Sequence, residues 1–138
     1  SPMTIKKDQF KIPDSKYAED FLEMNVLVNS STWEKYLREV VTGLEKCNFD
    51  FIKKLQTNDY KNYQFKQELV LQKWHSELPL FLLLGKHDQI VGFKEQVKLA
   101  KNFKKSSFLV IEAAGHNLPI DQPKIFSSCV QSFFDSVS

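Results

Sequence analysis

The pattern of apolar and polar positions is most regular between residues 78 and 116. Residues 80–84 read Leu-Phe-Leu-Leu-Leu and lie between Pro79 and Gly85. A short apolar run with such boundaries predicts a strand that is buried on both faces, as parallel strands covered by helices are. Residues 108–111, Phe-Leu-Val-Ile, form a second run of this kind. The chain is therefore expected to contribute two strands here.

The stretch between these two runs has the period of a helix instead. Its apolar residues recur at intervals of four, three and three among lysine and glutamate side chains: Phe93, Val97, Ala100 and Phe103. This spacing predicts an amphipathic helix with one face directed to a core, followed by lysines at its solvated end. A strand, a helix and a strand in succession form a βαβ unit, whose crossover makes the two strands parallel.

The end of the chain predicts one more helix. Asp121 is expected to cap it, with Pro123 in the first turn, where the missing amide of proline costs little. Its apolar positions repeat at intervals of three and four: Ile125, Phe126, Cys129, Val130, Phe133, Phe134 and Val137. This face is expected to pack on the sheet. Residues 78–138 are therefore predicted to form a strand-helix-strand-helix unit of the α/β class.

The first part of the chain, residues 1–77, has short helical patterns rich in aromatic residues. Residues 1–13 show no period and are interpreted as an entry linker. Asp14 or Ser15 is expected to cap a short helix, whose apolar residues are Tyr17, Phe21 and Leu22.

A longer helix is predicted next. Ser31 and Glu34 fit a capping box, in which each side chain bonds the backbone amide of the other. One face of this helix carries Trp33, Leu37, Val40, Val41 and Leu44, and it is expected to end near Asn48. Asp50 is expected to cap a further short helix, whereas the period of residues 67–74 is ambiguous.

Composition limits the class of protein. The chain has 138 residues, with 19 basic and 17 acidic side chains and a net charge of +2. This length suits one domain, and the charge gives no field that would favour nucleic acid. Two cysteines without a pattern suggest a reducing compartment, and no apolar run approaches about 18 residues. With no signal peptide at its start, we expect a soluble, cytoplasmic protein without a membrane partner.

Two residues with catalytic potential follow the two predicted strands. Asp88 lies just beyond the first strand and His116 just beyond the second. Parallel strands place their carboxyl ends at the same edge of a sheet, where open α/β sheets bind ligands, so we expect these side chains to lie together. A carboxylate beside an imidazole can orient the base that takes the proton of a nucleophile. Simpler interpretations also exist: Asp88 as a turn residue and His116 as a surface histidine.

The residues around this pair resemble a known family. Residues 79–88, Pro-Leu-Phe-Leu-Leu-Leu-Gly-Lys-His-Asp, and residues 110–123, Val-Ile-Glu-Ala-Ala-Gly-His-Asn-Leu-Pro-Ile-Asp-Gln-Pro, are similar to the last third of an α/β-hydrolase. The resemblance covers residues 79–137. It implies that Asp88 is the acid and His116 the base of a serine hydrolase triad, acting without a cofactor on a small carboxylic ester, amide or related bond.

One part of the family's pattern is absent from this sequence. The family's nucleophile lies upstream of the acid and base, on a Gly-x-Ser-x-Gly turn. The four glycines do not bracket a serine, and no His-Gly-Gly stretch is present for an oxyanion hole: Gly43, Gly85, Gly92 and Gly115. The resemblance therefore implies an incomplete α/β-hydrolase fold. Residues 1–77 would be a helical cap segment with its entry linker, and residues 78–138 the C-terminal part of the core.

This departure leads to expectations about activity and partners. The chain alone should not hydrolyse esters. The strand of residues 80–84 has an edge that seeks pairing, which the missing N-terminal part of the hydrolase or a second copy of the chain would supply by strand pairing or an exchanged segment. Two other possibilities stay open. The chain is a truncated, non-catalytic relative that serves as a binding module, or a small independent α/β binding domain in which Asp88 and His116 occur by chance.

Other reactive side chains form weaker patterns. Cys129 lies on the apolar face of a predicted helix, where cysteine behaves as a small hydrophobic residue, and Cys47 lies at a helix end. His75, His87 and His116 have neither helical i, i+4 spacing nor a nearby cysteine ligand, so no metal site is expected. His87 is expected to flank the acid as a pocket or surface residue.

Overall fold

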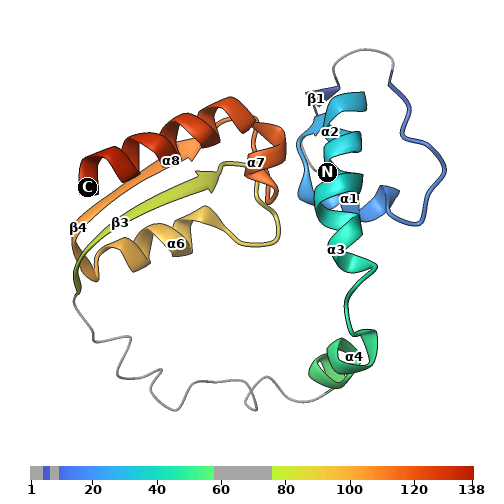
Figure 1. The fold of residues 1–138 in the computed structure, drawn as a ribbon, viewed down its shortest axis with the longest axis horizontal. Helices are drawn as coiled ribbons and strands as arrows, with labels where there is room; N and C mark the ends of the chain where they lie inside the picture. Colours follow the sequence, from blue (N-terminus) through green and yellow to red (C-terminus); the bar gives the residue numbers. More distant parts are fainter. Residues whose placement is uncertain (1–4, 7–9, 58–75) are drawn as a thin grey trace.

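The computed structural model describes residues 5–6, 10–57 and 76–138. Figure 1 shows two parts, a βαβα unit and a group of short helices, which meet near α7. In chain order the described elements are β1 (Ile5–Lys6), α1 (Ala18–Met24), β2 (Leu27–Val28), α2 (Ser30–Tyr36), η1 (Leu37–Val41), α3 (Thr42–Leu44), α4 (Phe49–Thr57), β3 (Ser76–Gly85), α6 (Phe93–Ala100), β4 (Phe103–Ile111), α7 (Leu118–Asp121) and α8 (Pro123–Val137).

The predicted βαβα unit is confirmed. Strands β3 and β4 are parallel, with Leu82 opposite Phe108 and Gly85 opposite Ile111. Helix α6 covers one face of the pair and α8 the other (Figure 1). The ring of Phe133 on α8 stacks on Phe81 of β3 at a centroid distance of 6.0 Å. The fold class inferred from the apolar runs is therefore correct.

The boundaries of these elements differ from the prediction. The helix was expected to include Phe103, but α6 ends at Ala100 and Phe103 begins β4, opposite Ser76. Lys104 and Lys105, expected at the solvated end of that helix, are exposed on β4. The four-residue apolar run identifies only the C-terminal part of this strand, because residues 104–107 are polar. Burial on both faces was also wrong for this strand, since Phe108 and Leu109 are exposed and only Ile111 of the run is buried.

The last helix also begins differently. Pro123 is its first residue, as predicted, but the residue that precedes it is Gln122, and Asp121 ends the separate short helix α7. Asp121 therefore does not cap α8, and its carboxylate is turned to the core instead. On α8, the apolar residues form a wide face that leaves Ile125, Phe134 and Val137 exposed.

The N-terminal helices surround an aromatic core. Phe21 contacts Trp33 and Tyr36 edge to face, with ring centroids 5.2 Å apart in each pair. The core also contains Val28, Val41 and, from α7, Ile120. The longer predicted helix is present as α2, the π-helical turn η1 and α3. Because Ile120 belongs to this core, α7 joins the N-terminal helices to the βαβα unit.

Four local predictions in the N-terminal part are wrong. Tyr17 precedes the first residue of α1 and no side chain caps this helix, so neither Asp14 nor Ser15 does so. The capping box is formed by Asn29 and Thr32, whose side chains each accept from the amide of the other, and not by Ser31 and Glu34. Asn48 caps α4 by accepting from the amide of Phe51 (3.0 Å), so Asp50 lies within the first turn. The expected linker contains β1, which pairs in parallel with β2. Strands of two residues are too short to produce a periodic pattern.

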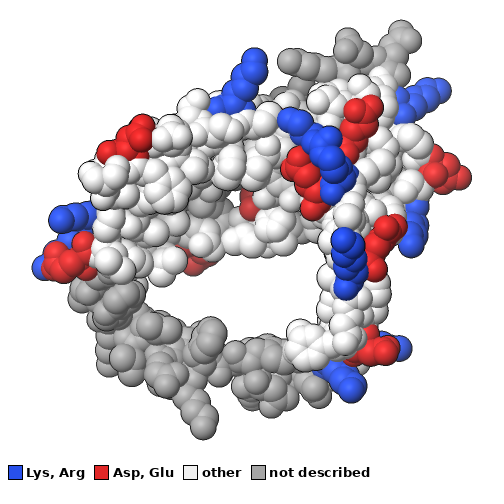
Figure 2. Space-filling model, viewed as in Figure 1, with Lys and Arg blue, Asp and Glu red and all other residues white. Residues whose placement is uncertain are grey.

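Three further expectations concern residues 67–75, membrane-spanning helices and surface charge. The predicted stretch of residues 67–74 and His75 lie outside the described residues. Within the described ranges, no helix combines the length and apolar character needed to cross a bilayer. Basic and acidic side chains are interspersed on the face seen in Figure 2, in keeping with the net charge of +2.

Candidate active site

The turn that follows β3, residues 86–91, carries the candidate acid Asp88 and is called the acid arm. The amides of Lys86 and His87 donate to the carbonyl oxygens of Ile111 (2.9 Å) and Ala114 (3.0 Å), which fixes this turn against the end of β4. Asp88 follows directly. Its Oδ1 accepts from the amides of Ile90 and Val91, both at 2.9 Å. Asp88 is therefore a turn residue, as its simpler interpretation proposed, but only one of its carboxylate oxygens serves the turn.

The base arm is the loop of residues 112–117, which follows β4. Ala113 adopts a left-handed backbone conformation, with φ of 52°. The carbonyl oxygen of Ala113 accepts from Nε2 of Gln122 at 3.0 Å. On either side of His116, the amide of Gly115 donates to Asp121 Oδ2 (2.8 Å) and the amide of Asn117 to the carbonyl of Met24 (3.0 Å). The backbone that carries His116 is thus held at several points.

The two arms bring Asp88 and His116 together. Asp88 Oδ2 lies 3.2 Å from Nδ1 of His116, and the two side chains are 14% and 35% exposed. A carboxylate at Nδ1 favours the tautomer that carries its proton there, which leaves Nε2 as the acceptor for another proton. The predicted proximity is therefore observed, and the roles of acid and base remain predictions.

A hollow of about 340 Å³ adjoins this pair. Gly115 and Leu118 line it together with residues of β3 and of the acid arm, among them Leu82, Leu84, Asp88 and Val91, and with His116. No described residue of β4 lines it. Phe93 and Gln96 of α6 also line it, so the hollow lies between β3, α6 and the loops that carry Asp88 and His116. In the described part of the chain, β4 is the only strand that pairs with β3.

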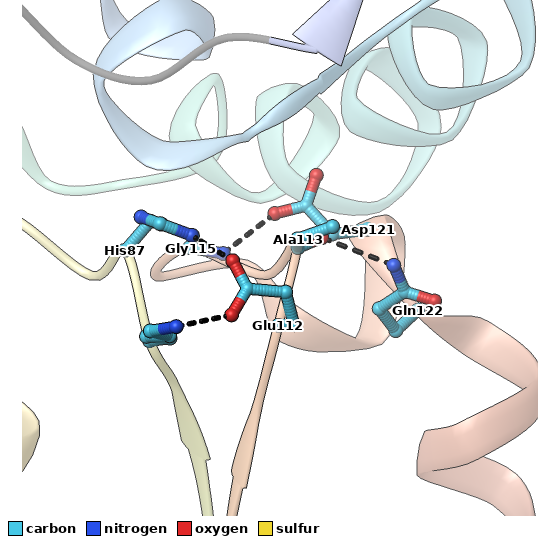
Figure 3. A network of polar contacts seen from close by, with 7 residues as sticks. His87, Glu112, Ala113, Gly115, Asp121 and Gln122 are labelled. Carbon is cyan, nitrogen blue, oxygen red and sulfur yellow. Dashed lines mark hydrogen bonds and ion pairs between the residues drawn. The ribbon is translucent and has the colours of Figure 1, made fainter.

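A second polar cluster joins the two arms (Figure 3). Glu112 contacts Lys86 through one carboxylate oxygen and Nε2 of His87 through the other, the latter at 2.7 Å. The hydrogen bond from Lys86, and then that from His87, lower the pKa of Glu112. His87 is thus mostly covered and faces Glu112 and not the hollow. No pattern in the sequence indicates this role for Glu112, because it depends on the register of two strands.

Asp121 is the other residue that the sequence did not identify. It is 2% exposed, and its carboxylate accepts from the amides of Val26, Leu27 and Gly115. Burial raises the pKa of Asp121, and the three amides oppose this by stabilising the charged form. Its proximity to a proline suggested a helix cap, which is a common position for aspartate.

The remaining candidates are the cysteines and the other histidines, of which His75 lies outside the described residues. In the described ranges, no three His, Cys, Asp or Glu side chains are grouped so as to hold a metal ion. Cys47 and Cys129 are free thiols, and both are half-buried. Cys47 Sγ lies 3.4 Å from the carbonyl oxygen of Gly43, the residue four positions earlier. This contact is typical of a cysteine at a helix end.

Comparison with known proteins gives two matches, and no family model matches the chain. A 1-acylglycerol-3-phosphate O-acyltransferase of Saccharomyces cerevisiae is 34% identical over 58 residues, which are 40% of this chain and 15% of the acyltransferase. The crystal structure of an α/β-superfamily hydrolase from Oenococcus oeni is 31% identical and covers 96% of this chain with a TM-score of 0.83.

The chain has part of an α/β-hydrolase fold. The resemblance noted from residues 79–88 and 110–123 is confirmed by this match, as is the incomplete fold with two parallel strands. The chain spans about half (49%) of the length of the Oenococcus hydrolase. Whether residues 1–77 form a cap in the sense of this fold stays a prediction.

Proposed function

We propose that Asp88 and His116 are the acid and base of a serine hydrolase triad whose nucleophile lies on polypeptide other than these residues. The observation that carries this proposal is the 3.2 Å contact between Asp88 Oδ2 and His116 Nδ1 at the rim of a hollow. The contact is made by Nδ1 of His116, so the other ring nitrogen, Nε2, is left to accept the proton of a nucleophile. No Gly-x-Ser-x-Gly turn occurs in the 138 residues, so the chain alone is expected to be inactive.

The chemistry is the transfer of an acyl group. A serine hydroxyl attacks the carbonyl carbon of an ester or amide while His116 takes its proton at Nε2, and the leaving group receives that proton. Water then attacks the acyl-serine in the same manner. Asp88 stabilises the positive charge that forms on His116 in both steps. The two matched proteins, named as a hydrolase and an O-acyltransferase, support a small carboxylic ester, amide or related substrate.

The serine is proposed to arrive with a strand that pairs with β3. The hollow that Asp88 and His116 line is bounded by β3 and α6 and by no described residue of β4, and residues 80–84 form an apolar, half-buried strand. The other outer edge, on β4, carries the exposed Lys104 and Lys105, and lysines at an edge discourage strand pairing. We therefore propose further hydrolase polypeptide as the partner at β3, and a second copy of this chain as the alternative outcome.

A chimera tests this function. The segment of the Oenococcus hydrolase that this chain matches is replaced by the chain, and hydrolysis of p-nitrophenyl acetate and butyrate is measured. We expect hydrolysis that is lost in Asp88→Asn and His116→Ala and kept in Glu39→Gln, an exposed change outside the site. A folded chimera that is equally active with and without His116 contradicts the proposal. A folded chimera that binds a serine-directed probe only poorly, and turns over no ester, favours a non-catalytic binding module.

The partner is tested separately from the chemistry. Analytical ultracentrifugation of the isolated chain shows whether it self-associates, and amide hydrogen exchange shows whether residues 80–84 become protected when it does. Some of these amides already bond β4, so the test concerns those that point away from it. A monomer in which the amides that point away from β4 are already protected would contradict pairing at this edge. Protection that grows with the concentration of the chain alone identifies a second copy as the occupant.

A further inference from the structure

Asp121 is the only charged residue that is buried among those the structure describes. It lies five positions after His116 in the sequence. Oδ1 accepts from the amides of Val26 and Leu27, each at 3.0 Å, and Oδ2 accepts from the amides of Gly115 at 2.8 Å and Val26 at 3.1 Å. Every donor is a backbone amide, so the carboxylate serves to hold chain segments together.

The segments that it joins lie far apart in the sequence. Val26 and Leu27 enter β2 beside the aromatic core of the N-terminal helices, whereas Gly115 precedes the candidate base. On the other side of His116, the amide of Asn117 donates to the carbonyl of Met24 at 3.0 Å. The residue before and the residue after His116 are therefore both bonded to residues 24–27 or to the carboxylate that holds them (Figure 3 shows Asp121 directed at Gly115).

Close packing completes this arrangement. A Cβ atom on Gly115 would lie 2.9 Å from the carbonyl oxygen of Met24 and 3.4 Å from Asp121 Oδ2. The same atom would lie 3.2 Å from Cγ2 of Val26, so the backbone of the base arm packs directly against residues 24–26. A displacement of residues 24–27 must move the backbone of His116 or break these hydrogen bonds.

We propose that Asp121 is a positioning residue, which fixes the imidazole of His116 relative to the N-terminal helices. This inference rests on the proposed function of His116 as the base. A triad works only when its groups are held close to one geometry, so a carboxylate that ties the residue before the base to a second core has a direct effect on the base. The N-terminal helices then determine the position of the His116 imidazole through Asp121, in addition to any contact that these helices make with substrate.

The test uses the 138-residue chain and the nearly isosteric variant Asp121→Asn. An asparagine side chain has one acceptor oxygen and one NH2 group. The backbone amide of either Leu27 or Gly115 would then face this NH2 group, which cannot accept its hydrogen bond. We expect the amide that loses its acceptor to exchange with solvent about tenfold faster or more, as a buried donor without a partner does. We also expect the ring nitrogen signals of His116 to shift toward those of Asp88→Asn, because the contact with Asp88 is loosened.

A matched control separates positioning from general stability. Val41→Ala removes buried apolar volume from the N-terminal core, and neither its backbone nor its side chain bonds the base arm. This variant is expected to unfold more easily while the ring signals of His116 stay as in the unaltered chain. The proposal is overturned if Asp121→Asn leaves those signals unchanged, or if Val41→Ala shifts them as much.

The unaltered chain provides a second measurement in case Asp121→Asn does not fold. The amides of Val26, Leu27 and Gly115 share one carboxylate, so their protection factors are expected to agree within about threefold, as for one cooperative opening. Exchange of Gly115 at a rate unrelated to the other two overturns the proposal. Neither experiment measures catalysis, so the two proposals can fail separately. An inactive chimera, with the expected changes in amide exchange and in the His116 signals, rejects the triad alone. An active chimera without those changes rejects the role of Asp121.

Discussion

Gly85, at the end of β3, and Gly115, in the loop after β4, approach each other closely enough that no side chain fits between them. A Cβ atom on Gly85 would lie 2.3 Å from the carbonyl oxygen of Gly115 and 2.7 Å from that of Ala114. The acid arm and the base arm are therefore in backbone contact. The distance between Asp88 and His116 depends on this contact as much as on the strands that precede them.

Gly85→Ala is expected to separate the two arms. The added methyl group meets backbone oxygens, which cannot rotate away as a flexible side chain can, so the base arm must shift. We expect a loss of about 1 to 3 kcal/mol in the free energy of unfolding, as in other overpacked sites. Urea denaturation measures this loss, and the ring signals of His116 report the shift of the base arm.

Gly43→Ala is the matched control for that experiment. Nothing lies within 4 Å of a Cβ atom at Gly43, which belongs to the short helix α3. Alanine favours a helix over glycine by roughly 1 kcal/mol, so this variant is expected to be as stable as the unaltered chain or more so. If both glycine variants lose the same stability, the close approach at Gly85 is not the cause.

Asp88→Asn is expected to keep the turn after β3 intact and to lower the turnover of the hydrolase chimera. Asparagine can still accept from the amides of Ile90 and Val91 through its one oxygen, so the acid arm should keep its shape. The group that faces Nδ1 of His116 becomes a neutral amide. In a serine protease triad such a change lowers turnover by about 10⁴. We expect a loss of that order in the hydrolase chimera, with an unchanged urea midpoint, and full turnover would remove Asp88 from the triad.

Serine-directed labelling tests where the nucleophile lies. A fluorophosphonate probe reacts with a hydroxyl that an adjacent histidine activates. We expect no labelling of the isolated chain and labelling of the chimera, on a serine outside the residues of this chain. Mass spectrometry of the labelled peptide identifies the site. A label on any serine of the isolated chain would show that the nucleophile was wrongly placed.

The buried carboxylate of Asp121 is expected to give stability a distinct pH dependence. Burial raises its pKa above the ordinary value of 3.8, so between that value and the raised one the folded chain holds more protons than the unfolded chain. The contribution of Asp121 to stability therefore falls as pH rises through this window. Glu112, whose pKa is lowered, contributes in the opposite sense, losing its stabilisation as pH falls.

A comparison of variants isolates the contribution of Asp121. Urea midpoints of the unaltered chain and of Asp121→Asn are measured from pH 3.5 to 7. The difference between the two curves removes the contribution of Glu112, which both chains share. We expect the advantage of the unaltered chain to be largest at the acidic end of the range. An advantage that grows steadily with pH would mean that the pKa of Asp121 is lowered in the folded state.

The sequence by itself determined the two parallel strands, the helices that cover them and the positions of Asp88 and His116 at the strand ends. Apolar periodicity is a local property, because one buried face repeats its pattern within a few residues. The end of the first strand is also marked locally, here by Gly85. The proximity of the two candidate residues then followed from the rule that a βαβ crossover makes its strands parallel.

Only the tertiary structure decided how this pair is held. The bonds from Val26 and Leu27 to Asp121 span 95 and 94 residues, and those from Lys86 and His87 to Glu112 span 26 and 25. Such contacts depend on how separate segments meet in space, and a single sequence carries no local pattern for them. The sequence therefore indicates the chemical groups of the site, while long-range hydrogen bonds set their geometry.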